Sequence, residues 1–338
     1  MSIENDGHVG ALTIAALGAA DGREALDALA IDPALLDQRG ETVSRGAFAM
    51  AMNVVLFHDL LERVYSGAHY VADTLSRGGR VTFDHGALRT IRFPDGPTGA
   101  LPAGEDAFTR ILLPLGYTMA ALYPLDRLRM TGRAYVHTDW PEAVPQFFLS
   151  ELHVDRFDAD FADCAARVFG TSRDPLTDAA KDVLARYAAG DTVPFAVAAN
   201  ALPTIVAAFD RQHDVPDFDD YQLLLSRSNE AAWIATEGNA FNHATDRVAD
   251  VAALADRLKA DGQPMKDRLE ISATGRVRQT AFRADSVERR FADGAVRQVP
   301  GSFYEFISRD VDPATGRIDL AFDTGNATGI FAMTSAGA

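Results

Sequence analysis

The chain has 338 residues, of which 47% are hydrophobic and 24% are charged, proportions that are typical of globular proteins and exclude disordered and fibrous classes. Its formal net charge of -16 argues against nucleic acid and anionic membranes as partners, because both carry negative charge themselves. Cys164 is the single cysteine, which excludes a disulfide framework and disfavours a thiolate metal site. Its helical, apolar neighbours predict a buried helix residue.

The first residues, MSIENDGHVG, lack the basic and hydrophobic regions of a signal peptide, and no run of about 18 apolar residues occurs in the chain. We therefore expect a soluble, cytoplasmic protein with no membrane partner. The sequence carries no signal that predicts an oligomeric state.

Residues 10–78 are predicted to form a helical cap. Leu12 to Leu29 is alanine-rich and is interrupted at Gly22. Ser44 is suited to cap a second run of helical apolar spacing that ends at Gly67.

Residues 79–157 are predicted to form a first β-α-β-β-β module. After Gly78-Gly79 the pattern changes to the alternation of a strand, Val81 to Phe93, with His85 and Arg89 on its buried face. A buried histidine and arginine cost free energy unless they have partners, and a metal ion and an anionic substrate would supply these. The later elements of this module are a helix over 106–115 and strands over 128–137 and 147–157.

The order of elements then repeats. Residues 158–235 are predicted as a helical insertion and residues 236–330 as a second module. The second module has a strand from Ala240, a helix over 251–260, and strands over 269–272, 276–284 and 302–309. We therefore expect an α+β fold in which two modules form a central curved sheet, within a single catalytic domain that spans residues 1–338.

The two predicted histidine strands share a local pattern of Phe, then Asp or Asn, then His, with Arg four residues later. It places His85 and His243 at matching positions. Glu305 lies in the strongly β-forming run GSFYEFISR, where a buried carboxylate needs a cation nearby. Two imidazoles and one carboxylate on one side of a metal are typical of non-haem Fe(II) oxygenases. The hypothesis is an Fe(II) centre, while a solvent-facing Glu305 on an edge strand stays open at this point.

Other readings compete with this one. The triplets His137-Thr138-Asp139 and His153-Val154-Asp155, with His213 as a distal partner, could hold iron as in cupin-type 2-oxoglutarate-dependent oxygenases. Glu151, in the corresponding part of the first module, could line the site or replace Glu305. A non-catalytic protein of the same fold that binds a small ligand is a further alternative, and stoichiometric iron would distinguish it from the enzyme.

The stretches FDHGALRT, FNHATDR and GSFYEFISR together resemble the 2-oxoadipate dioxygenase/decarboxylase family, whose best-known activity is the D-2-hydroxyglutarate synthase step of bacterial lysine catabolism. The resemblance covers roughly residues 45 to 330 and implies a vicinal-oxygen-chelate-like fold. It implies that His85, His243 and Glu305 are the metal ligands and that Arg89 holds a substrate carboxylate. The chain is shorter than the lysine-pathway enzymes, which have additional segments that help to close the substrate pocket.

The activity that this resemblance implies is an Fe(II)-dependent decarboxylating dioxygenase. A 2-oxo acid similar to 2-oxoadipate would react with O2 to give CO2 and a 2-hydroxy acid by intramolecular hydroxylation, without separate 2-oxoglutarate. Arg278 and Gln279, on the predicted strand over 276–284, are further candidates for binding the distal end of the substrate.

Overall fold

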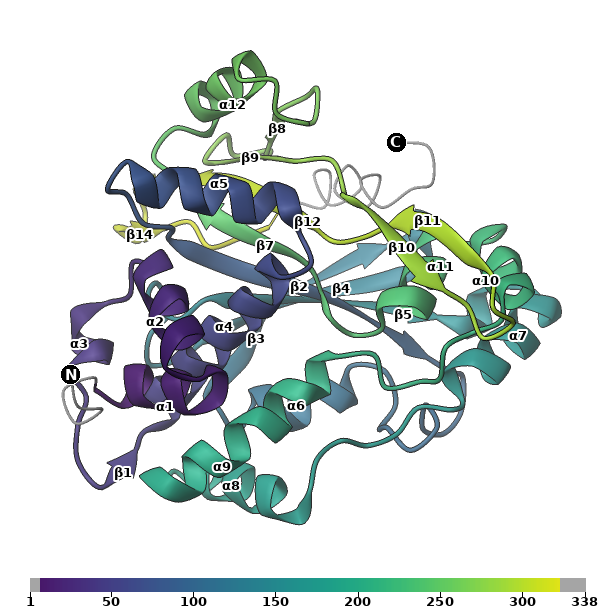
Figure 1. The fold of residues 1–338 in the computed structure, drawn as a ribbon, viewed down its shortest axis with the longest axis horizontal. Helices are drawn as coiled ribbons and strands as arrows, with labels where there is room; N and C mark the ends of the chain where they lie inside the picture. The colour runs from purple at the N-terminus through teal and green to yellow at the C-terminus, as the bar shows by residue number, and fades with distance from the viewer. Residues whose placement is uncertain (1–6, 323–338) are drawn as a thin grey trace.

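The computed structural model describes residues 7–322 and contains an eight-stranded, curved sheet at its centre (Figure 1). The spatial order of the strands is β3-β4-β5-β2-β7-β12-β9-β8. β2 (Phe83–Arg92) and β7 (Phe241–Arg247) pair antiparallel in the middle of this sheet, and each begins one half of it.

Both halves have the same order of elements. In the first half, β2 is followed by α6 (Asp106–Leu112), β3 (Tyr117–Leu125), β4 (Met130–His137) and β5 (Gln146–His153). In the second half, β7 is followed by α12 (Val251–Ala260), β8 (Glu270–Ile271), β9 (Val277–Ala281) and β12 (Phe303–Arg309). The first and last strands of each half pair in parallel, β2 with β5 and β7 with β12. The prediction of an α+β fold with two β-α-β-β-β modules is therefore confirmed.

Two strand features were not predicted. β3 is an edge strand in which Met119 and Leu122 are about half exposed, so it lacks the clear alternation that identifies a half-buried strand. β10 (Ser286–Arg290) and β11 (Val296–Pro300) form a separate antiparallel hairpin between β9 and β12. This hairpin packs against α10 and α11 through Phe291 and Val299.

Helices both precede the sheet and connect its halves. The described helices before β2 are α1 (His8–Leu17), α2 (Ala19–Ala28), α3 (Pro33–Leu36), α4 (Arg45–Leu61) and α5 (Tyr65–Ser76). Those between β5 and β7 are α7 (Ala159–Phe169), α8 (Asp178–Ala188), α9 (Phe195–Val206), α10 (Phe218–Leu225) and α11 (Asn229–Glu237). Among the described residues, no helix has the length and hydrophobicity that crossing a membrane requires.

The predicted long helix from Ser44 to Gly67 is two helices. Ser44 does cap α4, since its hydroxyl accepts a hydrogen bond from the backbone N–H of Ala47. The helix ends at Leu61, however, and Gly67 lies inside α5. A Cβ atom at Gly67 would lie only 2.7 Å from the Tyr304 ring, so this glycine lets α5 pack closely on β12 rather than ending a helix.

The two faces of the sheet have different surroundings. Leu88, Phe147 and Phe241 belong to the main hydrophobic core, which also contains most of α4 and part of α9. Because side chains alternate along a strand, His85, Ala87 and Arg89 of β2 lie on the opposite face, which we call the site face. Helix α11 packs near one end of β2.

Candidate metal centre

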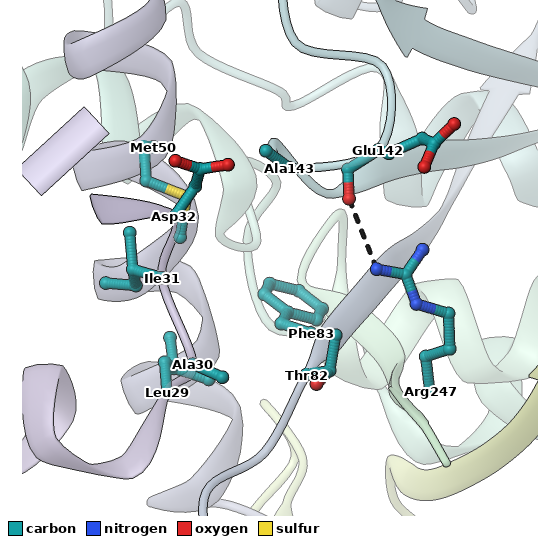
Figure 2. Close-up of a pocket in the computed structure, with 10 residues that line it drawn as sticks. All are labelled: Leu29, Ala30, Ile31, Asp32, Met50, Thr82, Phe83, Glu142, Ala143 and Arg247. Carbon is teal, nitrogen blue, oxygen red and sulfur yellow. Dashed lines mark hydrogen bonds between the residues drawn. The ribbon is translucent and has the colours of Figure 1, made fainter. Parts of the chain in front are cut away.

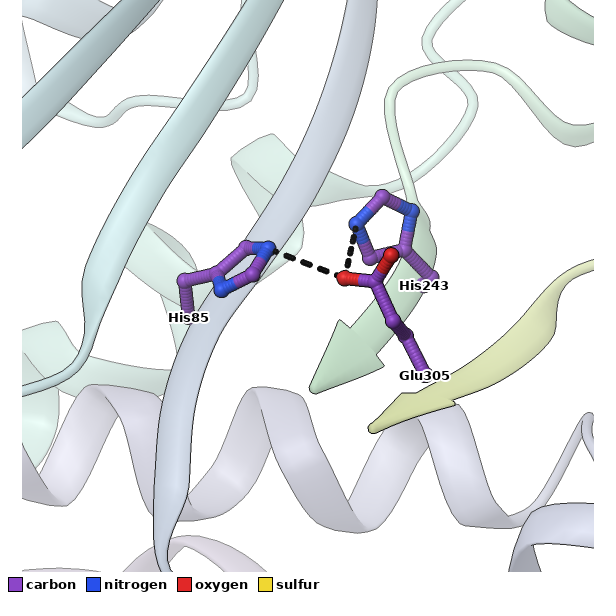
Figure 3. A group of neighbouring side chains, drawn as sticks. All are labelled: His85, His243 and Glu305. Atoms are coloured by element: carbon purple, nitrogen blue, oxygen red, sulfur yellow. Dashed lines mark ion pairs between the residues drawn. The ribbon is translucent and has the colours of Figure 1, made fainter. Parts of the chain in front are cut away.

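Three adjacent strands bring His85, His243 and Glu305 together on the site face. His85 lies opposite Thr245 of β7, and Thr245 lies opposite Glu305 of β12, while His243 is two residues before Thr245. Each residue contributes one ligand atom, and these atoms all lie within 4.8 Å of one another. Figure 3 shows the three side chains pointing toward a common point from three different strands.

The central atom of this group is Oε2 of Glu305. It lies 3.3 Å from Nε2 of His85 and 3.6 Å from Nε2 of His243. It also accepts a hydrogen bond of 2.7 Å from the hydroxyl of Thr245. All three candidate ligands are at most 3% exposed, so Glu305 is not the solvent-facing residue of an edge strand.

Gly86 allows β2 to approach β7 closely at this point. A Cβ atom on Gly86 would lie 2.2 Å from Cζ of Phe241, a distance that no real side chain could adopt. The glycine therefore admits the Phe241 ring beneath β2 and lets the strands that carry His85 and His243 pack together.

His85 is oriented by the residue before it. Its Nδ1 donates a hydrogen bond of 2.9 Å to Oδ1 of Asp84, which leaves Nε2 directed at Glu305. Asp84 in turn accepts hydrogen bonds of 2.9–3.1 Å from the guanidinium of Arg309. A carboxylate that fixes the tautomer and orientation of a histidine is the usual support of a metal-ligating imidazole.

The protonation states of His243 and Glu305 favour metal binding. Burial lowers the pKa of His243 to about 3, so its imidazole is neutral and has a free lone pair near pH 7. Burial alone would raise the pKa of Glu305, but the two histidines and Thr245 lower it overall. Burial would lower the pKa of His85, but its hydrogen bonds to Asp84 and Glu305 raise it, so a metal that binds Nε2 has to displace a proton from this histidine.

The donor set fits a divalent metal ion. Both ring nitrogens of His243 and Oε1 of Glu305 are buried. Within residues 7–322, none of these three atoms forms a hydrogen bond. Buried polar atoms without partners are costly, and a metal ion would satisfy His243 Nε2 and Glu305 together. Two imidazole nitrogens with one carboxylate suit iron, zinc or manganese and leave positions open for a ligand.

Arg89 lies on the site face, four residues after His85. Its side chain is fully buried, and its guanidinium carbon lies 5.0 Å from the centre of the Trp233 ring of α11. Burial lowers the pKa of Arg89 to about 10, and Glu230 partly opposes this shift, so Arg89 stays charged near pH 7. Its charge also contributes to the lowered pKa of His243, after the larger effect of burial.

The family model of 2-oxoadipate dioxygenase/decarboxylase matches residues 55–318 of the chain. The chain belongs to this family. A curated member, the chloroplastic 2-oxoadipate dioxygenase/decarboxylase of Arabidopsis thaliana, is 25% identical over an alignment of 292 positions that covers 75% of this chain and 68% of that protein. The resemblance found in the sequence is therefore confirmed.

Solved structures support the same fold. A glyoxalase-superfamily protein from Ralstonia eutropha JMP134 is 49% identical, with a TM-score of 0.89 over 94% of this chain and 99% of that one. The hydroxyglutarate synthase of Oryza sativa, solved in complex with 2-oxoadipate, has a TM-score of 0.68 at 21% identity, over 88% and 96% of the two chains. At that identity the second likeness concerns the fold alone.

The two distal substrate candidates lie on different sides of β9. Arg278 forms a bidentate ion pair with Asp310, with both nitrogen–oxygen distances at 2.7 Å, on the face opposite the site. Gln279 is buried on the site face, two residues from Ala281, the cross-strand neighbour of Glu305. Its amide donates to Glu270 at 3.2 Å. The structure thus brings Gln279, and not Arg278, toward the metal centre.

Glu151 is not an alternative ligand. It accepts hydrogen bonds of 2.7 Å from Arg92 and from the backbone N–H of Glu105, in an ion cluster on the other face of the sheet. Strand register makes Phe148 the counterpart of Glu305, because Phe148 pairs with Ala87 as Glu305 pairs with Thr245. The sequence comparison between modules was therefore shifted by three residues.

The histidine–x–aspartate triplets do not form a site. Nδ1 of His137 accepts hydrogen bonds from the backbone N–H groups of Asp139 and of the residue after it. His153 is hydrogen-bonded to Thr131, and His213 to a backbone carbonyl of α11. Over residues 7–322, the group of His85, His243 and Glu305 is the one cluster of ligand-type side chains with metal-binding spacing.

Several residues at the site were missed from the sequence. Asp84 had a visible signal, since it directly precedes the first histidine, whereas Arg309 acts on it from 225 residues away. Gln146 lies opposite His85 on β5 and is 2% exposed, and its amide forms no hydrogen bond with any described residue. Phe322, beyond the last strand, packs against the ring of His85.

A separate pocket connects to this network from the side of the N-terminal helices (Figure 2). It has a volume of about 250 Å³, and its wall includes Phe83, Glu142 and Arg247. Arg247 donates a hydrogen bond to the backbone carbonyl of Glu142, and its guanidinium also lies 3.8 Å from Asp84. The pocket therefore shares Arg247 with the residues that support His85, but it does not contain a candidate ligand.

Proposed function

We propose that the protein is a decarboxylating dioxygenase of a 2-oxo acid similar to 2-oxoadipate. The reaction joins one O2 and one 2-oxo acid to give CO2 and a 2-hydroxy acid that is one carbon shorter. Both oxygen atoms are accounted for in the products, one in the new carboxylate and one in the new hydroxyl group. The observation that carries the proposal is the buried group of His85, His243 and Glu305 in a member of this family.

The proposed metal is Fe(II), held by His85, His243 and Glu305. When bound, it would supply the redox chemistry with O2 and a positive charge for the oxygens of the 2-oxo acid. Asp84 keeps the proton on Nδ1 of His85, so that Nε2 is the ligand atom. The burial of all three ligands keeps bulk water away from the reacting groups.

Arg89 is the proposed carboxylate-binding residue. A planar, permanently charged guanidinium can bind a carboxylate through two parallel hydrogen bonds. Trp233 covers one face of the guanidinium and so fixes its plane. Gln279 is the proposed donor to a more distant polar group of the substrate, because its amide lies on the same face of the sheet.

The test is a measurement of O2 uptake and CO2 release by the Fe(II)-loaded protein, with a panel of 2-oxo acids that includes 2-oxoadipate. We expect one-to-one uptake and release without added 2-oxoglutarate. His85→Ala and His243→Ala should lose metal binding and turnover, whereas His58→Ala, on α4, should retain both. Arg89→Leu should keep the metal but lose substrate affinity.

Two results would contradict the proposal. Full activity of either ligand variant would remove the metal assignment. A protein that binds 2-oxo acids without metal and without turnover would be a ligand-binding protein instead. A cytoplasmic location and a role in lysine catabolism stay predictions, whereas the plant relatives are named as chloroplastic or amyloplastic proteins.

A further inference from the structure

The chain returns to the metal centre after its last long strand. A hairpin of β13 (Val311–Asp312) and β14 (Arg317–Ile318) reverses its direction, and residues 319–322, which we call the strap, then run back to the site face. The strap ends with Phe322, whose ring centre lies 4.8 Å from that of His85, with the planes at 88°. The same ring lies 5.0 Å from Phe148 and 6.2 Å from Tyr123.

Hydrogen bonds fix the strap in this position. Arg309 donates to the carbonyl oxygens of Asp319 and Ala321 at 2.9 Å and 2.8 Å. The backbone N–H of Phe322 donates to the hydroxyl of Tyr123 at 3.0 Å. The guanidinium of Arg309 also lies 5.1 Å from the centre of the Phe322 ring, so ring and backbone are both held.

The strap and the metal ligands share one anchor. Arg309 has no exposed side-chain surface, and the guanidinium that binds the strap also binds Asp84, which orients His85. The position of Phe322 relative to His85 is therefore set through the buried side chain of Arg309, although Ala321 of the strap is itself exposed.

The aromatic residues occupy one side of the metal centre. Phe148 occupies the position in the first module that corresponds to Glu305 in the second module. The ring of Phe322 packs against the ring of Phe148. Together with Tyr123 they form an apolar wall beside His85. Arg89, which is also on the site face, lies farther along β2. A ligand that contacts both the metal and Arg89 therefore has the aromatic wall along its flank.

We propose that Phe322 is a specificity-determining residue, which limits the width of the 2-oxo acid next to its oxo group. An unbranched acid would fit between the wall and Arg89, whereas a branched or aromatic substituent at the carbon beside the oxo group would collide with the Phe322 ring. This inference rests on the proposed function, because it assumes that a 2-oxo acid binds at the metal.

The test uses the full-length protein loaded with Zn(II), which binds without turnover. Calorimetric affinities are measured for 2-oxoglutarate and 2-oxoadipate as unbranched acids, and for 3-methyl-2-oxobutanoate and phenylpyruvate as wide acids. Phe322→Ala should improve the affinity for wide acids relative to unbranched ones by about tenfold or more, which is the effect of a few methylene-sized contacts. Tyr123→Phe, which removes the hydroxyl that holds the strap, should shift the ratio in the same direction by less.

Phe218→Ala is the matched control. Phe218 is also a partly buried ring under an arginine, with Arg297 4.4 Å from its centre, but it is the first residue of α10 and packs against Phe291 of the β10–β11 hairpin. Its loss should leave the ratio of affinities unchanged. A second measurement follows the release of Zn(II) to excess chelator, which Phe322→Ala should accelerate several-fold and Phe218→Ala should not.

The outcomes separate this inference from the proposed function. If the parent protein binds 2-oxo acids but Phe322→Ala matches it in both the affinity ratio and metal release, Phe322 does not determine specificity. If the parent binds Zn(II) but none of the acids, the proposed function fails. In that case the proposed role of Phe322 in specificity also fails. If Phe322→Ala does not change the rate of Zn(II) release either, Phe322 does not shield the metal.

Discussion

At the scale of single residues, Asp84 decides which nitrogen of His85 is available to a metal. An ionised carboxylate can only accept hydrogen bonds, so its contact with Nδ1 requires a proton there, and Nε2 is the nitrogen that can give up its proton and bind a metal. Burial alone would raise the pKa of Asp84, but Arg309 and His85 hold it well below its usual range. The aspartate thus keeps its charge despite being buried.

Asp84→Asn should weaken metal binding while leaving the three ligands in place. Loss of an outer carboxylate of this kind costs about 10- to 100-fold in metal affinity, because the imidazole loses its fixed tautomer and part of its basicity. Titration calorimetry with Zn(II) measures the effect, and circular dichroism checks the fold. Asp139→Asn is a suitable control, since Asp139 also lies near a histidine and pairs with Arg45 but is outside the site. Equal affinities for Asp84→Asn and the parent would exclude this role.

At the scale of elements, the sequence predicts a strand correctly where the pattern of its own residues identifies it. The alternation around His85, the matching pattern around His243 and the apolar run around Glu305 predicted the strands of the three candidate ligands. Strand register was not predictable, because it depends on pairing between distant segments. For that reason Glu151 was compared with Glu305, although pairing makes Phe148 its counterpart.

Long-range contacts explain the other differences between sequence and structure. Nothing near Arg278 indicates that Asp310 binds it, and the role of Arg309 depends on Asp84 in a strand of the other module. The helix end predicted at Gly67 was wrong because glycine often marks a helix end, whereas here Gly67 lies inside α5 and makes room for Tyr304.

The C-terminal end of α4 contains a carboxyl group whose pKa is altered. Burial raises the pKa of Asp59 from 3.8 to about 6, and the nearby Asp210 adds to the shift. The folded state therefore binds a proton more tightly than the unfolded state. The Asp59 carboxyl group therefore contributes most to the free energy of unfolding below about pH 4, and this contribution is lost as the pH rises through about 6.

Asp59→Asn should remove the free-energy cost of burying the charged Asp59 carboxylate at neutral pH. At pH 7 the variant should be more stable than the parent by about 1–2 kcal/mol, after allowance for partial exposure of the group, and the difference should be small near pH 4. Urea unfolding at both pH values measures it. Asp21→Asn, an exposed aspartate of α2, serves as the control. A variant that is less stable than the parent at pH 7 would show that the charged form is stabilising.

At the scale of the whole molecule, the metal centre joins the two modules. His85 comes from the first strand of one module, while His243 and Glu305 come from the first and last strands of the other. The modules also meet through the antiparallel pairing of β2 and β7, and Arg309 of the second module binds Asp84 of the first. A bound metal would therefore link segments that lie 220 residues apart in the chain, from 85 to 305.

Metal binding should consequently raise the stability of the entire sheet. A ligand that binds the folded state alone adds about 2.7 kcal/mol to the free energy of unfolding when its free concentration is about 100 times its dissociation constant. Thermal unfolding of the metal-free protein, with and without Zn(II), should show this increase as one cooperative transition. His243→Ala should lose the increase because the site then has two ligands, while His58→Ala should keep it. A transition in which only part of the protein responds to Zn(II) would mean that the two modules unfold separately and that the metal does not couple them.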